Sequence, residues 1–270
     1  MPIRAAYFDW NGTLIQDRDD VGVLDAIRYK VQWERFNPLS GGVRYHTKPF
    51  WDLWALKNEV DRLYKYLNDG ANPEIVYKEI YAAYNKGVVE GLPMGFVESV
   101  IDEYAGDAAQ RVDKPVLDQI RKARSENPTL KYLVLGPSSG CRPAIEKTLE
   151  SAGYEGVFTR VIGNRIEQMN GGKHAKRFGI ELLGSDVKRR FLEEDLAMMD
   201  VSPADAIYMG DSEMDWGCFE LLAEAGGVPI VAPMAPKRFS ESSASRYGLK
   251  VKIPVNAKGF GKILLNSPTL

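Results

Sequence analysis

Acidic and hydroxyl side chains follow several short apolar runs of this sequence, at the points where a predicted strand ends and a turn begins. The residues concerned are Asp9, Ser138, Ser139, Asp211 and Asp215. Carboxylate oxygens are ligands that Mg²⁺ prefers, and hydroxyl groups donate hydrogen bonds to phosphate oxygens. Brought together in space, these residues would hold both a hard divalent cation and a phosphoryl group.

The elements that must position them are predicted from the same apolar runs. Short runs separated by helical patterns indicate an α/β fold with a Rossmann-like parallel sheet. The predicted strands cover residues 4–8, 131–135, 206–209, 228–231 and 249–253. The carboxyl ends of parallel strands lie along one edge of the sheet, where ligands bind. We therefore expect Asp9, Ser138 and Asp211 to meet at that edge.

The later part of the chain also predicts helices between these strands. They cover residues 143–152, 185–199 and 214–225, and Ser185 is the expected N-cap of the second. The basic stretch 173–177 is expected to be a solvated loop.

The long interval after the first strand is predicted to be helical. Residues 17–111 show helical periodicity and no strand alternation, and their many aromatic side chains suit the interior of a helical unit. We therefore expect a core made of residues 1–16 and 112–270, interrupted by a helical cap of residues 17–111.

Three short motifs resemble those of the haloacid dehalogenase superfamily. FDWNGTL at 8–14 resembles the first motif hhhDxDGT, LGPSS at 135–139 the second, and GDSEMD at 210–215 the fourth. Lys188 fits the third motif best, a lysine at the start of the helix before the fourth, with Arg189, Lys173 and Lys176 as competitors. The resemblance covers roughly residues 1–16 and 113–235. The insert matches only as a C1-type helical cap, and the layout is loosely like the phosphoserine phosphatase branch.

The resemblance implies a Mg²⁺-dependent phosphatase that acts on a small phosphorylated metabolite. In that scheme Asp9 attacks phosphorus and becomes an aspartyl-phosphate. Asp9 also binds Mg²⁺, together with the backbone carbonyl of Asn11 and the side chain of Asp211. Asp215 belongs to the same metal site, where it orients a metal-bound water or Lys188.

The resemblance also implies a phosphate-binding set. Ser138 donates a hydrogen bond to the phosphoryl group, with Ser139 and the backbone near Gly12 beside it. Lys188 offsets the negative charge of Asp9 and of the phosphate. Such a set lowers the repulsion between an anionic nucleophile and an anionic substrate.

Asn11 departs from the first motif, which usually has a second aspartate at this position. That aspartate protonates the leaving group and later activates water, and an amide cannot exchange protons in this way. General acid–base help is typically worth about 10²–10⁴-fold, so the hydrolysis of ordinary phosphate esters should suffer. The metal site is spared, because it uses only the backbone carbonyl of Asn11.

Several interpretations of Asn11 stay open. The substrate has a good leaving group such as an acyl phosphate, the aspartyl-phosphate passes to an acceptor other than water, or another acid such as Glu213 substitutes. Phosphonatases also have a non-acid here and need a cap lysine, for which Lys48 and Lys57 are candidates. Dehalogenases lack this aspartate too, but they work without metal, and the intact acidic motif GDSEMD argues against that interpretation. A second hypothesis, from a different class of function, is a non-catalytic phosphate-binding or regulatory module that lost its turnover because Asn11 replaced the aspartate.

Composition limits the other classes of function. The chain has 270 residues, 44% of them hydrophobic, and 35 basic against 37 acidic residues, which gives no electrostatic case for a nucleic-acid partner. No stretch approaches the roughly 20 apolar residues of a membrane span. Two cysteines, Cys141 and Cys218, do not make a disulfide framework. We expect a cytoplasmic protein with no membrane or nucleic-acid partner, and the sequence gives no oligomeric state.

Overall fold

The computed structural model describes residues 2–16, 22–36 and 50–265. Its centre is a five-stranded sheet in the order β3-β2-β1-β6-β7, and every neighbouring pair is parallel. The strands are β1 (Ala5–Phe8), β2 (Tyr132–Cys141), β3 (Arg160–Asn164), β6 (Ala206–Gly210) and β7 (Val228–Val231). The predicted α/β fold with a parallel sheet is confirmed.

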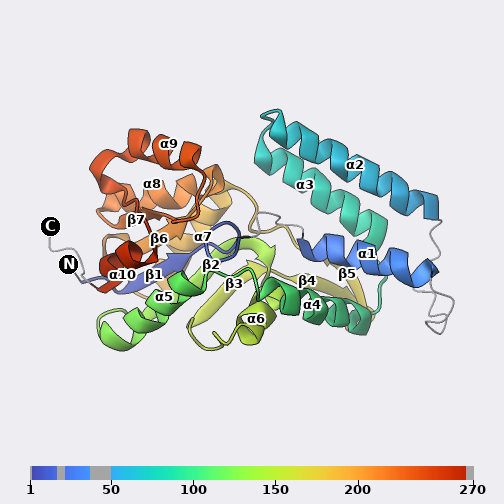
Figure 1. The fold of residues 1–270 in the computed structure, drawn as a ribbon, viewed down its shortest axis with the longest axis horizontal. Coiled ribbons are helices and arrows are strands. Elements are labelled where there is room, and N and C mark those ends of the chain that lie inside the picture. Colours follow the sequence, from blue (N-terminus) through green and yellow to red (C-terminus); the bar gives the residue numbers. More distant parts are fainter. Residues whose placement is uncertain (1, 17–21, 37–49, 266–270) are drawn as a thin grey trace.

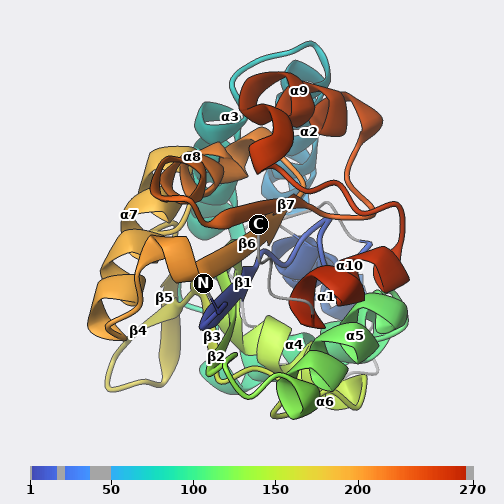
Figure 2. The same ribbon diagram turned by 90° about the vertical axis from the view of Figure 1, so that its left-hand side faces the viewer.

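Helices cover both faces of the sheet (Figures 1 and 2). One face carries α5 (Lys114–Glu126), α6 (Arg142–Ser151) and α10 (Ala257–Leu265). The other carries α7 (Ser185–Met198), α8 (Trp216–Ala225) and α9 (Lys237–Tyr247). Short helical turns lie at Pro203–Asp205, Glu213–Asp215 and Gly248–Lys250.

The middle strand, β1, shows how the sequence specifies this packing. All four of its residues are fully buried, as expected for a strand covered on both faces. Ala6 and Phe8 join the apolar cluster of α5 and α10, whereas Ala5 and Tyr7 join that of α7 and α8. Because side chains alternate along a strand, Asp9 continues the row of Ala5 and Tyr7, toward the layer that contains α7.

One strand prediction and one loop prediction were wrong. Residues 249–253 do not form a full strand: they start in a helical turn and make a single parallel bridge, Lys252 to Ile230. The fifth strand of the sheet is instead β3, which the sequence did not suggest because its side chains are mostly half-buried. The basic stretch 173–177 is also not a loop. Most of it forms β5 (His174–Phe178), which pairs antiparallel with β4 (Ile166–Met169).

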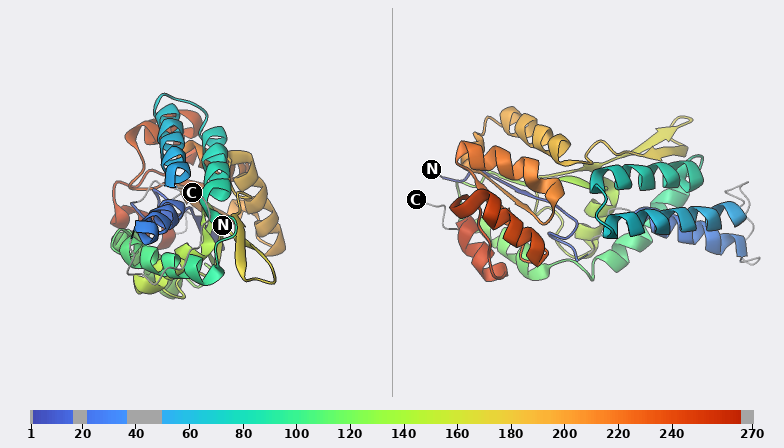
Figure 3. Two further views of the ribbon diagram at one scale, coloured as in Figure 1. Left: turned by 90° about the vertical axis from the view of Figure 1, so that its right-hand side faces the viewer. Right: turned by 90° about the horizontal axis from the view of Figure 1, so that it is seen from above.

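The expected helical insertion after β1 is present. It contains α1 (Gly22–Phe36), α2 (Phe50–Asn68), α3 (Pro73–Tyr84), a π-helical turn (Asn85–Val89) and α4 (Met94–Ala108). These helices, which we call the helical insert, form most of a second apolar cluster, to which a few residues of β2, α6 and β5 also belong. Seen from above in Figure 3, they lie at the opposite end of the molecule from the two chain termini.

The chain leaves the core for the insert and returns to it at adjacent positions. Ile15 and Val112 form an antiparallel bridge, Gln16 N–H donates to the carbonyl of Arg111 at 3.0 Å, and Asp113 N–H donates to that of Leu14 at 2.8 Å. These bonds lie beside the predicted division at residues 16 and 112, which itself stays a prediction.

The hairpin β4–β5 joins the insert by backbone hydrogen bonds. Gly91 N–H donates to the carbonyl of Ala175 at 2.9 Å, and Ala175 N–H donates to that of Leu92 at 2.8 Å. The side chain of Asn85 makes a two-way contact with the backbone of Phe178, at 2.8 and 2.9 Å. The hairpin therefore packs with the insert, and Ala175 and Phe178 belong to its apolar cluster.

Within the described ranges, no helix has both the length and the apolar composition that crossing a bilayer requires.

Candidate active site

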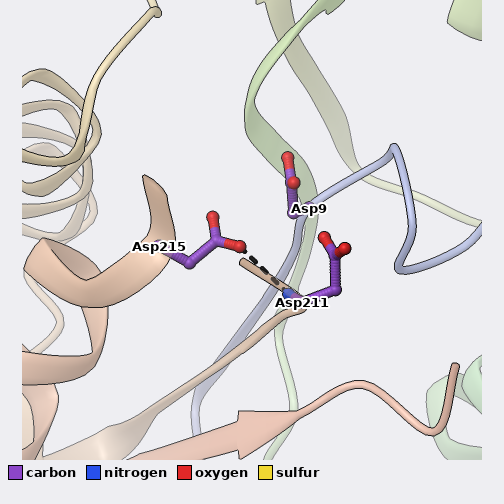
Figure 4. Close-up of side chains that lie close together, drawn as sticks. All are labelled: Asp9, Asp211 and Asp215. Atoms are coloured by element: carbon purple, nitrogen blue, oxygen red, sulfur yellow. Dashed lines mark hydrogen bonds between the residues drawn. The ribbon is translucent and has the colours of Figure 1, made fainter. Parts of the chain in front are cut away.

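Three buried carboxylates meet where β1 and β6 end (Figure 4). Asp9 follows β1, and Asp211 and Asp215 follow β6. Each of the three offers an oxygen atom that lies within 4.8 Å of those of the other two. They are 4%, 6% and 0% exposed. The two strands are neighbours in register, and Asp9 N–H donates to the carbonyl of Met209 at 2.9 Å, which fixes the two strand ends together.

A tight turn after Asp9 brings the chain against Asp211. The backbone N–H groups of Thr13, Leu14 and Ile15 all donate to the carbonyl of Trp10. Gly12 has φ of +69°, and a Cβ atom there would lie 2.1 Å from Oδ2 of Asp211. Glycine is therefore required both by the backbone conformation and by the close approach.

Asp215 is held by donors on both of its oxygens. Oδ1 accepts from Nζ of Lys188 and from Oη of Tyr208, each at 2.8 Å. Oδ2 accepts from the backbone N–H of Asp211 at 3.0 Å, from that of Ser212 at 3.3 Å and from the Ser212 hydroxyl at 3.5 Å. A carboxylate with this many donors is fixed in orientation.

Lys188 lies between the strand ends and is only 1% exposed. Its Nζ is 3.2 Å from Oδ1 of Asp9 and 2.8 Å from Oδ1 of Asp215. A lysine is almost never buried unless it is paired, and here it bridges two carboxylates. We call Asp9, Asp211, Asp215 and Lys188 the acidic centre.

The start of α7 is positioned against α8 by a close contact. Gly217 N–H donates to Oγ of Ser185 at 2.7 Å, and a Cβ atom on Gly217 would lie 2.5 Å from the Ser185 carbonyl. Ser185 is thus the first residue of its helix, and its N-cap is Gly184, not Ser185 as predicted. This contact brings the first turns of α7, with Lys188, alongside Asp215.

The competing cations lie elsewhere. Arg189 pairs with Glu224 at 2.8 Å and with Glu220 at 3.5 Å, and Lys176 pairs with Glu167 at 3.2 Å. The carbonyl of Lys173 accepts a hydrogen bond from Met94 in the insert.

Burial and negative charge both act on groups beside the acidic centre. Burial, followed by the charge of Asp215, raises the pKa of the Tyr208 phenol well above its ordinary value. Burial and Asp215 likewise raise the pKa of the Cys218 thiol. Both side chains therefore stay protonated at pH values where the free groups would ionise, so neither adds a negative charge beside the three carboxylates.

The composition of the acidic centre suits a divalent cation. Its carboxylate oxygens are hard ligands of the kind that Mg²⁺ prefers, and Lys188 pairs with two of the three carboxyl groups, Asp9 and Asp215. Asp9 and Asp211 are the better candidates for direct ligands, because the oxygens of Asp215 already accept five hydrogen bonds.

The two predicted serines lie at the end of β2, next to β1. Ser138 is fully buried, and its Oγ accepts from the backbone N–H of Gly140 at 3.2 Å. The carbonyl of Ser139 accepts from the side chains of Asn164 at 2.7 Å and of Tyr81 at 3.0 Å. Because Tyr81 belongs to α3, this bond joins the insert to the strand end that carries the serines.

The alternatives around Asn11 gain little from the geometry. Asn11 is half-buried in the turn after Asp9 and forms a bridge with Ile15. Glu213, the suggested replacement acid, pairs with Arg238 at 3.3 Å. Lys57 is exposed and pairs with Asp61 on its own helix. The other suggested lysine, Lys48, falls outside the described residues.

Sequence reasoning missed Tyr208 and Tyr81. Tyr208 stands in the middle of an apolar run and looks like a packing residue, and nothing in the spacing of Tyr81 points to Ser139. Only the contacts in three dimensions identify them.

Comparison with known proteins supports the same architecture. No protein-family model matches the chain, and neither does any curated protein sequence. Among solved structures, a protein of unknown function from Bordetella pertussis Tohama I has a TM-score of 0.61 at 16% identity, covering 93% of this chain and 99% of that one. A HAD family hydrolase from Salmonella enterica serovar Typhi has a TM-score of 0.59 at 13% identity, covering 100% and 74%.

A substrate-bound phosphoserine phosphatase is also similar, with a TM-score of 0.54 at 16% identity over 89% of this chain and 90% of that one. These identities are low, so the likeness concerns the fold. The sheet order, the helical insertion after β1 and these structures together show that the chain has the fold of the haloacid dehalogenase-type (HAD) hydrolases.

Proposed function

We propose that this protein is a Mg²⁺-dependent phosphatase that acts on a small phosphorylated metabolite through an aspartyl-phosphate on Asp9. The observation that carries the proposal is the acidic centre. A buried carboxylate, Asp9, faces both a second carboxylate and a buried lysine at the ligand-binding edge of a parallel sheet. Placing these charges in the interior is costly, and chemistry on a charged phosphoryl group gives a reason for it.

Asp9 and Asp211 would hold the metal, together with the backbone carbonyl of Asn11. When bound, Mg²⁺ would polarise a phosphoryl oxygen and offset negative charge. Asp215 has a different part in this proposal: it anchors Lys188 and the backbone of Asp211, as its hydrogen bonds favour.

The reaction then divides into two displacements at phosphorus. In the first, a carboxylate oxygen of Asp9 forms a bond to phosphorus while the bond to the leaving oxygen breaks. Lys188, 3.2 Å from Asp9, offsets the charge that gathers there, and Ser138 donates a hydrogen bond to the phosphoryl group. In the second, water displaces Asp9 from phosphorus and releases inorganic phosphate.

Asn11 favours substrates whose leaving group needs no proton. Its amide supplies no proton to the departing oxygen. A carboxylate leaving group departs as a stable anion, so acyl phosphates and phosphoanhydrides suit this chain better than alkyl phosphates do. The helical insert would select among such substrates and exclude water when it lies against the core.

The test compares hydrolysis of acetyl phosphate and of p-nitrophenyl phosphate, with and without Mg²⁺. We expect metal-dependent phosphate release that disappears in Asp9→Asn, with acetyl phosphate the better substrate. Asp205→Asn is the control, because Asp205 is a buried carboxylate at the amino end of β6, away from the acidic centre. Release that survives in Asp9→Asn would overturn the assignment of the nucleophile.

Asn11 also favours a second candidate, a phosphate-binding or regulatory module without turnover. The variant Asn11→Asp separates the two, because a restored acid should raise p-nitrophenyl phosphate hydrolysis by about 10²-fold or more if only this group is missing. Absence of release from both substrates with any divalent metal, in wild type and in Asn11→Asp, would favour the binding module.

A further inference from the structure

Tyr208 lies directly beneath the acidic centre. It stands in the middle of β6, is fully buried, and its Oη is 2.8 Å from Oδ1 of Asp215. This phenol is kept protonated by burial and by the nearby carboxylates, so it acts as a hydrogen-bond donor. Its acceptor oxygen is the same one that accepts from Lys188.

The neighbouring strand carries a second buried tyrosine at the matching position. Tyr7 on β1 pairs in register with Tyr208, lies on the same face of the sheet and is also fully buried. Its Oη donates at 2.8 Å to Oδ2 of Asp195 on α7, which also pairs with Arg160. The chain thus places two phenols side by side, each on a buried carboxylate, and only that of Tyr208 leads to the acidic centre.

The hydrogen bonds of Asp215 explain what Tyr208 contributes. Oδ2 accepts from the backbone N–H groups of Asp211 and Ser212 and from the Ser212 hydroxyl, whereas the donors to Oδ1 within the described residues are Lys188 and Tyr208. Without the phenol, Oδ1 keeps a single mobile donor. The carboxylate could then rotate toward Lys188. This rotation would move Nζ of Lys188 away from Asp9 and weaken the hydrogen bonds that hold the loop at Asp211.

We propose that Tyr208 is a positioning residue that, through Asp215, sets the distance from Lys188 to Asp9 and the conformation of the loop at Asp211. The hydrogen-bond geometry carries this proposal. Its consequence for catalysis rests on the function proposed above, whereas its consequence for the loop does not.

The experiment compares Tyr208→Phe with Tyr7→Phe. Each variant removes one buried hydroxyl from adjacent positions and keeps the ring, so their effects on packing are closely matched. Acetyl phosphate hydrolysis by Tyr208→Phe should show kcat lower by about 10–100-fold with KM little changed, as expected for a lost hydrogen bond to a charged group. Tyr7→Phe should keep wild-type kcat.

A double variant tests whether Tyr208 acts through Asp215. Adding Tyr208→Phe to Asp215→Asn should lower kcat little further, because the carboxylate that the phenol positions is already gone. Fully additive losses in kcat would overturn the proposal, and so would equal losses in Tyr208→Phe and Tyr7→Phe.

Amide hydrogen exchange gives a readout that needs no activity. The amides of Asp211 and Ser212 should exchange faster in Tyr208→Phe than in wild type, and should be unchanged in Tyr7→Phe. Unchanged exchange in Tyr208→Phe would overturn the proposal. If wild type hydrolyses neither substrate, the proposed function fails, and the exchange rates still decide whether Tyr208 holds the loop.

Discussion

The acidic centre and the helical insert bury different kinds of side chain. At the end of β1 and β6, three carboxylates and a lysine are almost completely withdrawn from solvent. Among the described residues of α1 to α4, the buried side chains are aliphatic, aromatic or methionine, and none belongs to an acid, a base, an amide, a serine or a threonine. Inside the insert, the hydroxyl of Tyr84 contacts Asp25, which also pairs with Arg28, and this polar cluster is only partly buried.

This difference determines how each region responds to change. Buried charges depend on their partners, so removing one leaves another unpaired in a medium of low dielectric. Buried hydrocarbon depends on volume, so a change costs contacts and cavity but leaves no unpaired charge. Under the proposed function, a substitution in the acidic centre should therefore affect both charge balance and chemistry, whereas one in the core of the insert should affect packing alone.

The largest effect is expected from Lys188→Met. Without the lysine, the buried carboxylates Asp9 and Asp215 lose the cation they share, which should lower the free energy of unfolding by about 3–5 kcal/mol and abolish measurable phosphate release. The control is Arg189→Met, which removes the adjacent, partly exposed cation and should cost about 0–1 kcal/mol. Urea denaturation and acetyl phosphate hydrolysis measure both quantities. A Lys188→Met protein as stable as Arg189→Met would remove the contrast between the two regions.

A cavity in the insert should affect stability and not chemistry. Ile80 is fully buried in α3, and Ile80→Ala should lower the free energy of unfolding by about 2–5 kcal/mol. The kcat for acetyl phosphate, measured well below the unfolding midpoint, should stay near the wild-type value. Circular dichroism melting with parallel assays tests this, and a loss of kcat comparable with that of Lys188→Met would show that the insert is coupled to the acidic centre.

Cys141 lies where the sheet meets the insert and should make stability depend on pH in the alkaline range. It ends β2 but belongs to the apolar cluster of the insert, and burial raises its pKa from 9.0 to about 12. Between these values the unfolded chain loses the thiol proton and the folded chain keeps it. Stability should therefore fall as pH rises through this window, by up to about 1.4 kcal/mol per pH unit from this group.

The variant Cys141→Ala lacks the thiol, so its free energy of unfolding should fall less steeply above pH 9 than that of the wild type. Below pH 9 the two proteins should show the same pH dependence. Urea denaturation of both proteins at pH values on either side of 9 provides the comparison. Identical slopes in the two proteins would mean that the thiol is not buried in solution.

The smallest effect is expected at the outer surface of the insert. Trp54 on α2 is 53% exposed, and Trp54→Ala should change the free energy of unfolding by no more than about 0.5 kcal/mol. Chemical denaturation detects a larger loss, which would indicate that this face packs against something in solution.

The sequence predicted the parts of the site that depend on local pattern. An apolar run followed by an acid was sufficient to place Asp9 after β1 and Asp211 after β6. Residues 160–164 gave no such pattern, because an edge strand with half-buried side chains lacks a continuous apolar run. Hairpin β4–β5 was missed because its basic residues alternate with few apolar ones.

The finer arrangement of the site depends on contacts between residues distant in sequence. Lys188 was preferred over its neighbours only by the order of motifs, and its pairing with Asp215 spans 27 positions of the chain. Tyr208 donates to a carboxylate seven residues away, but only because the loop after β6 folds back over the strand. Spacing alone does not reveal such a return of the chain.

The backbone bonds between the hairpin and the insert set a rule for exchanging caps between proteins of this fold. The insert begins and ends at the Ile15–Val112 bridge, so its two attachment points are already adjacent and a foreign insert of any length could be joined there. However, if the insert alone were exchanged, the backbone groups of Ala175 and Phe178 in the hairpin would lose their hydrogen bonds to the insert. The transferable unit is therefore made of two separate stretches of chain, and a recombination that moves one must also move residues 166–178.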